Sequence, residues 1–213
     1  HPEVLKALSL NPIGHLDEVY LELMSDVQKL LRYTWQCDNR VSLPMSGTGS
    51  AAMEASIANF IEEDETILIA KKGYFGDRLV DMASRYKANV VVMEKNWGEA
   101  FSLDEIKIQI EKNKPSIFAI VHAETSTGVL QPLEGIGEIC RMNNCLFLVD
   151  AVTSLGAVKL LVNDWKIDLA YSCSQKGLSC PPGLSPFTMN CRAEEKLKNR
   201  KSKVPNWYLD LSL

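Results

Sequence analysis

Two charged side chains in the second half of the chain have the types and spacing that covalent chemistry needs. Asp150 directly follows the apolar run CLFLV, and Lys176 is the single lysine in the polar loop after a second run, residues 168–171. Both therefore lie where a buried strand of a parallel sheet is expected to end. A lysine amine attacks a carbonyl when a shaped, partly desolvated site holds it. A carboxylate keeps a pyridine nitrogen protonated, so the pair supplies the two groups that pyridoxal phosphate needs.

A glycine-rich loop at residues 46–50, SGTGS, precedes a helical segment of small residues. Two glycines let the backbone approach an anion closely, and the hydroxyls of Thr48 and Ser50 can donate hydrogen bonds to it. The free N–H groups of the helix start face the same point. The loop has neither the Gly-Lys-Ser/Thr end of a Walker loop nor the GxGxxG pattern. Alone, it predicts a plain glycine turn as readily as a phosphate cradle.

Two further loops carry aromatic or polar residues after predicted strands. In residues 72–76, KGYFG, Phe75 can lie flat on a planar ring or pack under the loop, and packing under a loop is the commoner arrangement. In residues 122–128, HAETSTG, several hydroxyl groups are available for ligand contacts. His122 by itself is typical of a buried core histidine, and Glu124 of a structural carboxylate that binds a nearby loop.

The four loops together favour one shared ligand. Asp150 alone is explained by a helix N-cap or a loop acid, and Lys176 alone by a surface lysine. In order along the chain, however, the loops offer an anion cradle, an aromatic plate, hydroxyl groups, and an acid with an amine. These are the parts of a single cofactor site, and chance would have to supply all four.

The elements that must position these loops alternate along the chain. Apolar, β-rich runs predict strands at residues 66–70, 89–93, 117–121, 145–149, 169–172 and 184–189. Helical spacing and capping signals predict helices at residues 16–36, 50–61, 75–86, 102–112, 133–142 and 193–200. Runs such as IFAIV and CLFLV lack polar alternation, which is typical of strands buried on both faces. The sequence therefore predicts an α/β fold, a mostly parallel central sheet flanked by helices, with ligands at the carboxyl ends of its strands.

Composition narrows the class of protein. The 213 residues are 46% hydrophobic and 23% charged, and the net charge of −4 comes without a basic stripe. No apolar run approaches membrane-spanning length. The six cysteines form no CxxC pair, and the three histidines form no ligand cluster. We therefore expect a protein of a reducing compartment that binds no nucleic acid, no membrane and no metal.

Five strings in the chain resemble the class V (fold type I) pyridoxal-phosphate aminotransferases, specifically the alanine–glyoxylate and serine–pyruvate group. They are SGTGSAAMEA, GYFGDR, HAETSTGVLQPLEGIGE, FLVDAVTSLGA and YSCSQKGLSCPPGLSPF. They occur in the family's order across most of the chain. The resemblance implies that residues 1–213 are the cofactor-binding large domain of a fold type I enzyme, truncated at both ends, with a small C-terminal domain missing.

The resemblance also implies catalytic and ring-binding roles. Lys176 matches the Schiff-base lysine, which also moves the proton between the substrate Cα and the cofactor's C4′. Asp150 matches the acid that pairs with the protonated pyridine nitrogen. Val152 matches an apolar side chain on one face of the ring. Phe75 stands where many members place a tryptophan on the other face, so an aromatic plate is kept and the indole N–H is lost.

Further positions match the family's phosphate and hydroxyl contacts. Thr48, Gly49 and Ser50 match the phosphate loop, in which some members carry histidine in place of Ser50. Gln175 matches a glutamine beside the lysine that also touches the phosphate. Thr125 matches a hydroxyl near the 3′ oxygen of the cofactor, where many relatives have serine.

From this resemblance we expect a pyridoxal 5′-phosphate-dependent transaminase that moves an amino group from alanine or serine to glyoxylate or pyruvate. The mechanism is expected to be ping-pong, with small amino acids and 2-oxo acids as substrates. The family implies a homodimer. The expected compartment is the cytoplasm, or the peroxisome or mitochondrion in a eukaryote.

Two alternatives stay open on the sequence. The first is another class V reaction: transamination of 3-hydroxykynurenine or ureidoglycine, or a desulfurase or lyase step. A desulfurase needs a mobile catalytic cysteine, whereas Cys173 and Cys180 flank Lys176 closely and are typical of core or loop packing. The second is a nucleotide-binding domain without enzyme activity, in which residues 46–50 bind phosphate and Lys176 is only a surface charge.

Overall fold

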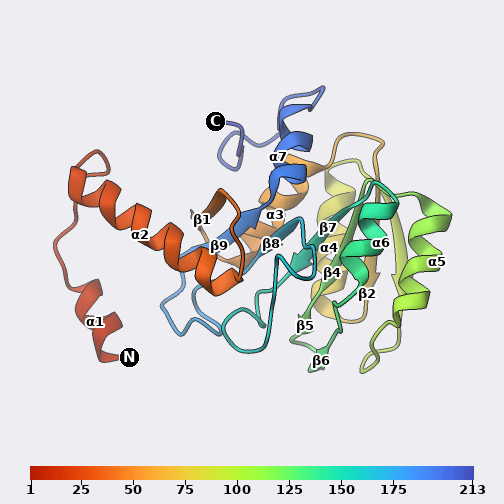
Figure 1. The fold of residues 1–213 in the computed structure, drawn as a ribbon, viewed down its shortest axis with the longest axis horizontal. Coiled ribbons are helices and arrows are strands. Elements are labelled where there is room, and N and C mark those ends of the chain that lie inside the picture. The colour runs from red at the N-terminus through yellow and green to blue at the C-terminus, as the bar shows by residue number, and fades with distance from the viewer.

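A seven-stranded sheet forms the centre of the computed structural model, which describes residues 1–213 (Figure 1). The strand order is β1-β9-β8-β7-β4-β2-β3. Neighbours from β3 to β8 pair in parallel, whereas β9 is antiparallel to both β8 and β1. The strand bounds are β1 (Val41–Ser46), β2 (Thr66–Lys71), β3 (Asn89–Glu94), β4 (Ile117–Val121), β7 (Leu146–Asp150), β8 (Leu169–Tyr171) and β9 (Leu184–Met189).

Helices cover both faces of the sheet, which confirms the predicted α/β fold. One face packs against α3 (Gly49–Phe60), α4 (Tyr74–Arg85) and α7 (Cys191–Lys198). The other packs against α5 (Leu103–Asn113), α6 (Ile136–Met142) and the C-terminal end of α2 (Glu18–Trp35). Every residue of β4 and β7 is buried, as their unbroken apolar runs predict.

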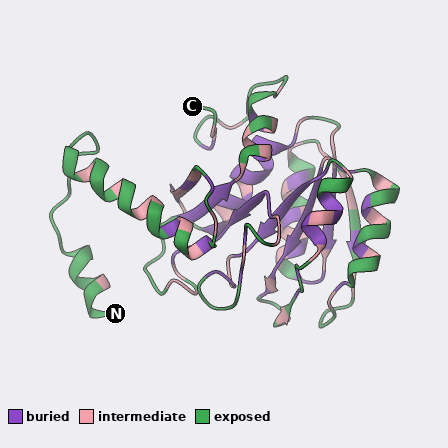
Figure 2. Cartoon of the chain, in the orientation of Figure 1, coloured by how far each residue is buried: buried purple, intermediate pink, exposed green.

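The N-terminal helices extend away from the sheet. Helix α1 (Pro2–Leu8) has no buried residue, and α2 buries only Leu31 and Trp35 near its end. Figure 2 shows most of the rest of this arm as exposed, with some intermediate positions, and the exposed residues include large apolar side chains such as Leu16 and Leu30. None of the helices combines the length and the apolar character that crossing a membrane requires.

The predicted helices and strands all occur, most within a few residues of the expected bounds. The helix predicted at residues 102–112 begins with a capping box, the Ser-x-x-Glu pattern of Ser102 and Glu105, which is one of the capping signals in the sequence. Helix α6 begins at Ile136 rather than residue 133, because Gly135 takes a left-handed conformation (φ 85°) immediately before it. Strand β1 was not predicted. Its pattern is interrupted by Pro44, which an edge strand tolerates because one row of its N–H groups needs no partner.

A short hairpin was also not predicted, and it belongs to the polar loop after β4. It consists of β5 (Ala123–Glu124) and β6 (Val129–Leu130), which pair antiparallel. Strands of two residues leave too short a pattern to recognise from alternation.

Candidate active site

The register of the sheet brings the chemistry-bearing loops to one edge. Asp150, the last residue of β7, pairs with Val121 on one side and with Tyr171 on the other. Since β2, β4, β7 and β8 are parallel, the loops that follow them leave the sheet at the same edge. Strand β1 also ends there, and the N–H of Gly47 beyond it donates to the carbonyl of Gly183 at 2.9 Å. The carboxyl edge is therefore the candidate site, as predicted.

Asp150 is a buried carboxylate held from two sides. Only 2% of the residue is exposed, and Oδ1 accepts the N–H of Val152 at 2.9 Å while Oδ2 accepts the hydroxyl of Tyr171 at 2.8 Å. Burial raises the pKa of Asp150 to about 6, although both hydrogen bonds act in the opposite direction. No cation pairs with it. A buried, uncompensated carboxylate is stabilised by a bound cationic group such as a protonated ring nitrogen.

Tyr171 is a residue of the site that the sequence pattern did not reveal. It is fully buried, and burial raises the pKa of its phenol well above the ordinary value, with the charge of Asp150 acting in the same direction. The phenol therefore stays a hydrogen-bond donor and fixes the orientation of the Asp150 carboxylate. Only the pairing of β7 with β8 shows that the two side chains are neighbours.

The glycine loop forms a tight entry to helix α3. Thr48 is the exposed N-cap and makes no side-chain hydrogen bond within the helix, so its hydroxyl is available. Gly49 is buried, and a Cβ on it would lie 2.8 Å from Cγ2 of Val152 and 3.4 Å from Cβ of Cys173. Glycine is thus required where the predicted phosphate loop crosses the loops after β7 and β8.

The predicted phosphate loop and the predicted aromatic plate meet through Arg78, another residue that the sequence did not point to. Arg78 Nη1 donates to Oγ of Ser50 at 2.9 Å. Its guanidinium carbon lies 4.9 Å from the ring centroid of Phe75, which is half-buried, and 5.3 Å from that of Tyr74. Helical spacing of Phe75 and Arg78 could have indicated that their side chains lie on one face.

Glu124 organises the aromatic loop, the structural role expected for it. Its carboxylate accepts the backbone N–H groups of Phe75 and Gly76, each at 3.3 Å, and the hydroxyl of Ser126 at 2.7 Å. A Cβ on Gly73 would lie 2.5 Å from Cγ of Glu124, so the approach needs glycine.

The remaining hydroxyl position lies on the same turn. Thr125 is exposed next to Glu124, and its Oγ1 lies 2.6 Å from Oγ1 of Thr153, beyond the end of β7. This contact joins the β4 loop to the β7 loop. The predicted 3′-oxygen contact thus lies at the same edge of the sheet as Asp150.

Lys176 lies in a turn that leaves the sheet after β8, and its side chain is exposed. Within residues 1–213 its amine is therefore open to solvent rather than partly desolvated. The backbone beside it is closely packed, since a Cβ on Gly177 would lie 2.2 Å from the carbonyl oxygen of Leu155. Gln175 carries a buried side-chain oxygen without a hydrogen-bond partner.

Cys173 is the cysteine to test for the desulfurase alternative, because the charges of both Lys176 and Asp150 influence its thiol. Only 1% of this residue is exposed, and burial raises the pKa of its thiol. The charges of Lys176 and Asp150 both act on the thiol, in opposite directions, so both side chains lie within electrostatic reach of it. A buried, protonated thiol on a packed loop is not a mobile nucleophile.

The arrangement fits pyridoxal phosphate. The buried carboxylate of Asp150 has no cation partner, the Gly49 loop presents helix N–H groups and a free hydroxyl, and a buried oxygen of Gln175 lacks a donor. Lys176 is the accessible amine at the same edge. A cationic ring, an anionic phosphate and a reactive carbonyl are the groups that this set of side chains can hold.

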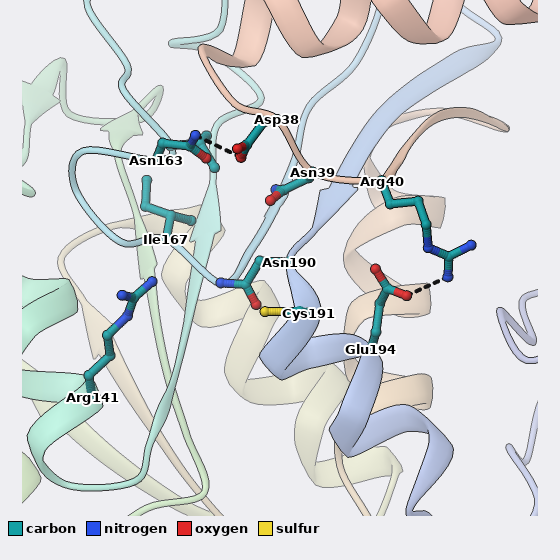
Figure 3. Close-up of a pocket in the computed structure, with 10 residues that line it drawn as sticks. Asp38, Asn39, Arg40, Arg141, Asn163, Ile167, Asn190, Cys191 and Glu194 are labelled. Carbon is teal, nitrogen blue, oxygen red and sulfur yellow. Dashed lines mark hydrogen bonds and ion pairs between the residues drawn. The ribbon is translucent and has the colours of Figure 1, made fainter.

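A cavity of about 610 Å³ lies at the opposite edge of the sheet (Figure 3). Its polar side chains bind one another: Asn163 donates to Asp38 at 2.8 Å, and Arg40 pairs with Glu194. The cavity is lined by residues that precede β1 and β8 or follow β9, and by Arg141 near the end of α6. It contains none of the predicted site residues and is separate from the candidate active site.

Two buried groups lie beside the site. Lys72 is 1% exposed, and its Nζ donates to the carbonyl of Val129 at 3.3 Å. Burial lowers its pKa to about 8, although the charges of Glu124 and Asp150 favour the protonated form. Burial, with a smaller effect of Lys72, lowers the pKa of His122 to about 4, so this histidine is neutral. His122 is thus a core histidine, as its sequence context predicts.

Replacing Lys72 with methionine is expected to stabilise the protein at pH 7. Since the folded-state pKa of about 8 lies below the ordinary 10.5, the unfolded chain binds this proton more readily, and stability rises between pH 8 and 10.5. Lys72→Met removes that dependence and gains up to about 3 kcal/mol at pH 7, falling to about 1 kcal/mol at pH 10. Denaturant unfolding at both pH values measures the gain.

The neighbouring Lys71 provides the control for this prediction. It is partly exposed and pairs with Asp77 and Glu94, each at 2.9 Å, and these hydrogen bonds raise its pKa. Lys71→Met should therefore give no gain at pH 7. Equal effects of the two substitutions, or a gain from Lys72→Met that is as large at pH 10 as at pH 7, would contradict the burial argument.

Comparison with known proteins agrees with this geometry. The family model described as "Aminotransferase class-V" matches residues 11–202. Alanine–glyoxylate aminotransferase of Mus musculus is 39% identical over 211 residues, covering 99% of this chain and 51% of the relative. (S)-Ureidoglycine–glyoxylate transaminase of Bacillus subtilis is 42% identical over 200 residues, covering 94% of this chain and 48% of the relative.

A solved structure gives the same result. The crystal structure of alanine–glyoxylate aminotransferase from Nostoc sp. superposes with a TM-score of 0.98 at 57% identity, covering 100% of this chain and 56% of that chain. The chain thus spans about half the length of the relatives it matches. The chain belongs to the class V aminotransferases, a family of pyridoxal 5′-phosphate enzymes.

Proposed function

We propose that the protein is a transaminase that moves an amino group from alanine or serine to glyoxylate, or to pyruvate. The observation that carries the proposal is Asp150, a buried carboxylate without a cation partner, at the same sheet edge as the accessible amine of Lys176. The similarity to alanine–glyoxylate aminotransferases at 39% and 57% identity supports the choice of substrates.

Each predicted site residue has a proposed part in holding the cofactor. Asp150 pairs with the protonated ring nitrogen, and Tyr171 keeps that carboxylate in place. Side chains on two loops flank the ring faces, and hydroxyl, amide and backbone N–H groups surround the phosphate and the 3′ oxygen. The ring residues are Phe75 and Val152; the phosphate residues are Thr48, Gly49, Ser50 and Gln175; the 3′-oxygen residue is Thr125.

The cofactor, when bound, supplies an electron sink for the charge that develops on the α carbon of the amino acid. Lys176 has two proposed tasks. Its Nζ holds the cofactor covalently between turnovers, and as a neutral amine it takes the proton from the α carbon and delivers it to C4′. Asp150 must stay ionised throughout, which its pKa of about 6 allows near neutral pH.

The two half-reactions use the same residues in opposite directions. The amino acid therefore leaves as a 2-oxo acid before glyoxylate enters, which is the basis of the proposed ping-pong order. Small amino acids and small 2-oxo acids are the proposed substrates.

We propose that the protein is a homodimer. Helix α2 supports this, because large apolar side chains on it, including Leu23 and Leu30, are 51% and 64% exposed, and Leu16 just before it is 80% exposed. All six cysteines are free thiols, which supports a reducing compartment: the cytoplasm, or the peroxisome or mitochondrion in a eukaryote.

The proposal is tested with purified protein and added pyridoxal phosphate. Visible absorbance should appear, and borohydride should fix the cofactor to Lys176, located by peptide mass spectrometry. Fixation to no lysine, as in a nucleotide-binding domain, would overturn the proposal.

Glycine formation is then measured with a panel of amino donors and glyoxylate as acceptor, which distinguishes the possible transamination reactions. Glycine formation from alanine or serine supports the proposed function. Formation from ureidoglycine alone would favour the alternative that the 42% identity to the Bacillus subtilis transaminase supports. Sulfide release from cysteine without transamination would indicate a desulfurase.

A further inference from the structure

Arg78 is a cation at the candidate site that has no carboxylate partner. It lies on α4, and other arginines such as Arg85 and Arg192 form ion pairs with Asp81 and Asp168. Of the five N–H donors of the Arg78 guanidinium, only one has a protein acceptor, the hydroxyl oxygen of Ser50 at 2.9 Å. A half-buried guanidinium with unused donors favours a nearby anion.

The hydrogen bond from Arg78 constrains the hydroxyl of Ser50. Because Oγ accepts from the guanidinium, the hydroxyl proton of Ser50 must point elsewhere. Ser50 is the second residue of α3, whose free N–H groups and helix dipole favour an anion at that end. The hydroxyl proton is thereby left free to donate to an anion at this end of the helix.

Arg78 also fixes the aromatic side of the site. Its guanidinium lies over the rings of Phe75 and Tyr74, at 4.9 Å and 5.3 Å from their centroids. These two rings are edge-on to each other, with centroids 5.5 Å apart. Cation–π contacts of this kind hold a planar guanidinium and a ring in one relative position.

The positive charge of Arg78 reaches the buried acid. Burial is the largest influence on the pKa of Asp150 and raises it, whereas Arg78 acts in the opposite direction. Arg78 likewise opposes the effect of burial on the pKa of Tyr171. The guanidinium thus contacts the anion loop through Ser50 and lies over the ring of Phe75, and its charge favours the ionised form of Asp150; the proposed function assigns all three groups to one cofactor.

We propose that Arg78 is a positioning residue that ties the phosphate loop to the aromatic plate, orienting the Ser50 hydroxyl toward the cofactor's phosphate and fixing Phe75 beside the ring. The proposal rests on the proposed function, because it requires pyridoxal phosphate as the ligand. It does not require Arg78 to touch the cofactor, since its effect is exerted through Ser50 and Phe75.

The test compares two ligands that differ only in the phosphate. Dissociation constants of pyridoxal phosphate and pyridoxal are measured by absorbance titration for the parent and Arg78→Met. We expect Arg78→Met to weaken pyridoxal phosphate binding about 10- to 30-fold and pyridoxal binding about threefold or less, because the Ser50 hydroxyl that Arg78 orients can make a charge-assisted hydrogen bond only to the ligand with a phosphate. Equal weakening for both ligands, or none, would overturn the proposal.

Two further variants separate positioning from a general structural role. In a Ser50→Ala background, Arg78→Met should cause little additional loss of phosphate discrimination, since the two residues act as a unit. Additive losses would show that Arg78 does not act through Ser50. Arg85→Met, on the same helix but exposed and paired with Asp81, should leave both dissociation constants unchanged.

The outcomes for the parent protein keep the two proposals distinguishable. If the parent binds neither ligand, the proposed function fails and this inference fails with it. If the parent binds pyridoxal phosphate and Arg78→Met retains the parent's preference for the phosphorylated ligand, only the role of Arg78 is refuted. A lower melting temperature with an unchanged preference is the result that a merely structural arginine would give.

Discussion

Replacing Lys176 with alanine is expected to abolish transamination between alanine and glyoxylate. The proposed function gives this one amine both the covalent hold on the cofactor and the proton transfer at the α carbon. General acid–base catalysis alone contributes about 10²–10⁴-fold in rate, so we expect a loss of at least about 10⁴-fold when both tasks are removed. The rate of glycine formation under saturating substrates measures it.

A second lysine makes this prediction specific. Lys72 also lies at the carboxyl edge, and burial lowers its pKa from 10.5 to about 8, which favours the neutral amine. Its side chain, however, is buried and bound to the carbonyl of Val129, whereas Lys176 is exposed and reachable. Borohydride labelling of the parent should therefore modify Lys176 and leave Lys72 unmodified.

The control for this prediction is Lys159→Ala, which removes another exposed lysine. That variant should keep the parent's rate and its labelling. Full activity of Lys176→Ala, or a label on Lys72, would refute the assignment of the nucleophile.

The position of the candidate site at the carboxyl edge of the sheet could be predicted, because the strands that form this edge are determined by local sequence. The run IFAIV in β4 is apolar throughout, and so is LFLV in β7 before Asp150, so strand type, burial and the end of each strand follow from composition alone. Parallel strands then bring their following loops together. The antiparallel direction of β9 and the presence of β1 at the edge of the sheet could not be predicted in this way. Both depend on long-range contacts: the antiparallel pairing of β9, and the edge position that tolerates Pro44.

The parts of the site that were missed depend on tertiary register. Tyr171 reaches Asp150 only because β8 pairs with β7 at that register, and Arg78 reaches Ser50 only because α4 packs beside α3. The close approach of Gly177 to Leu155 was missed as well, because it has no signature in the sequence of the turn itself.

Asp150→Asn is expected to lower activity while stabilising the protein without cofactor. An asparagine keeps the size of the side chain but cannot offset the charge of a protonated ring nitrogen. Breaking a buried ion pair by removing one partner costs about 3–5 kcal/mol, which corresponds to a loss of about 10²–10⁴-fold in cofactor affinity or kcat. Absorbance titration and steady-state rates measure the two effects.

The stability of the cofactor-free protein should change in the opposite direction. The pKa of Asp150 is about 6 in the folded chain against an ordinary 3.8, so the folded chain binds this proton more readily than the unfolded chain. The free energy of unfolding therefore falls as the pH rises from 3.8 to 6, and the full cost of ionisation is present above pH 6. Removing the charge should stabilise the variant by about 2–3 kcal/mol at pH 7, and by less than about 1 kcal/mol at pH 4.

Tyr171→Phe is the matched control, because it removes the 2.8 Å hydrogen bond to Asp150 and leaves the charge. Tyr171→Phe should destabilise the cofactor-free protein, whereas Asp150→Asn should stabilise it. Tyr171→Phe should also weaken cofactor binding, by a smaller factor than Asp150→Asn does. The opposite signs of the Asp150→Asn effects are what separate a functional acid from a structural one. A structural carboxylate would lose stability on substitution, whereas a residue kept for the cofactor costs stability until the ring nitrogen pairs with it.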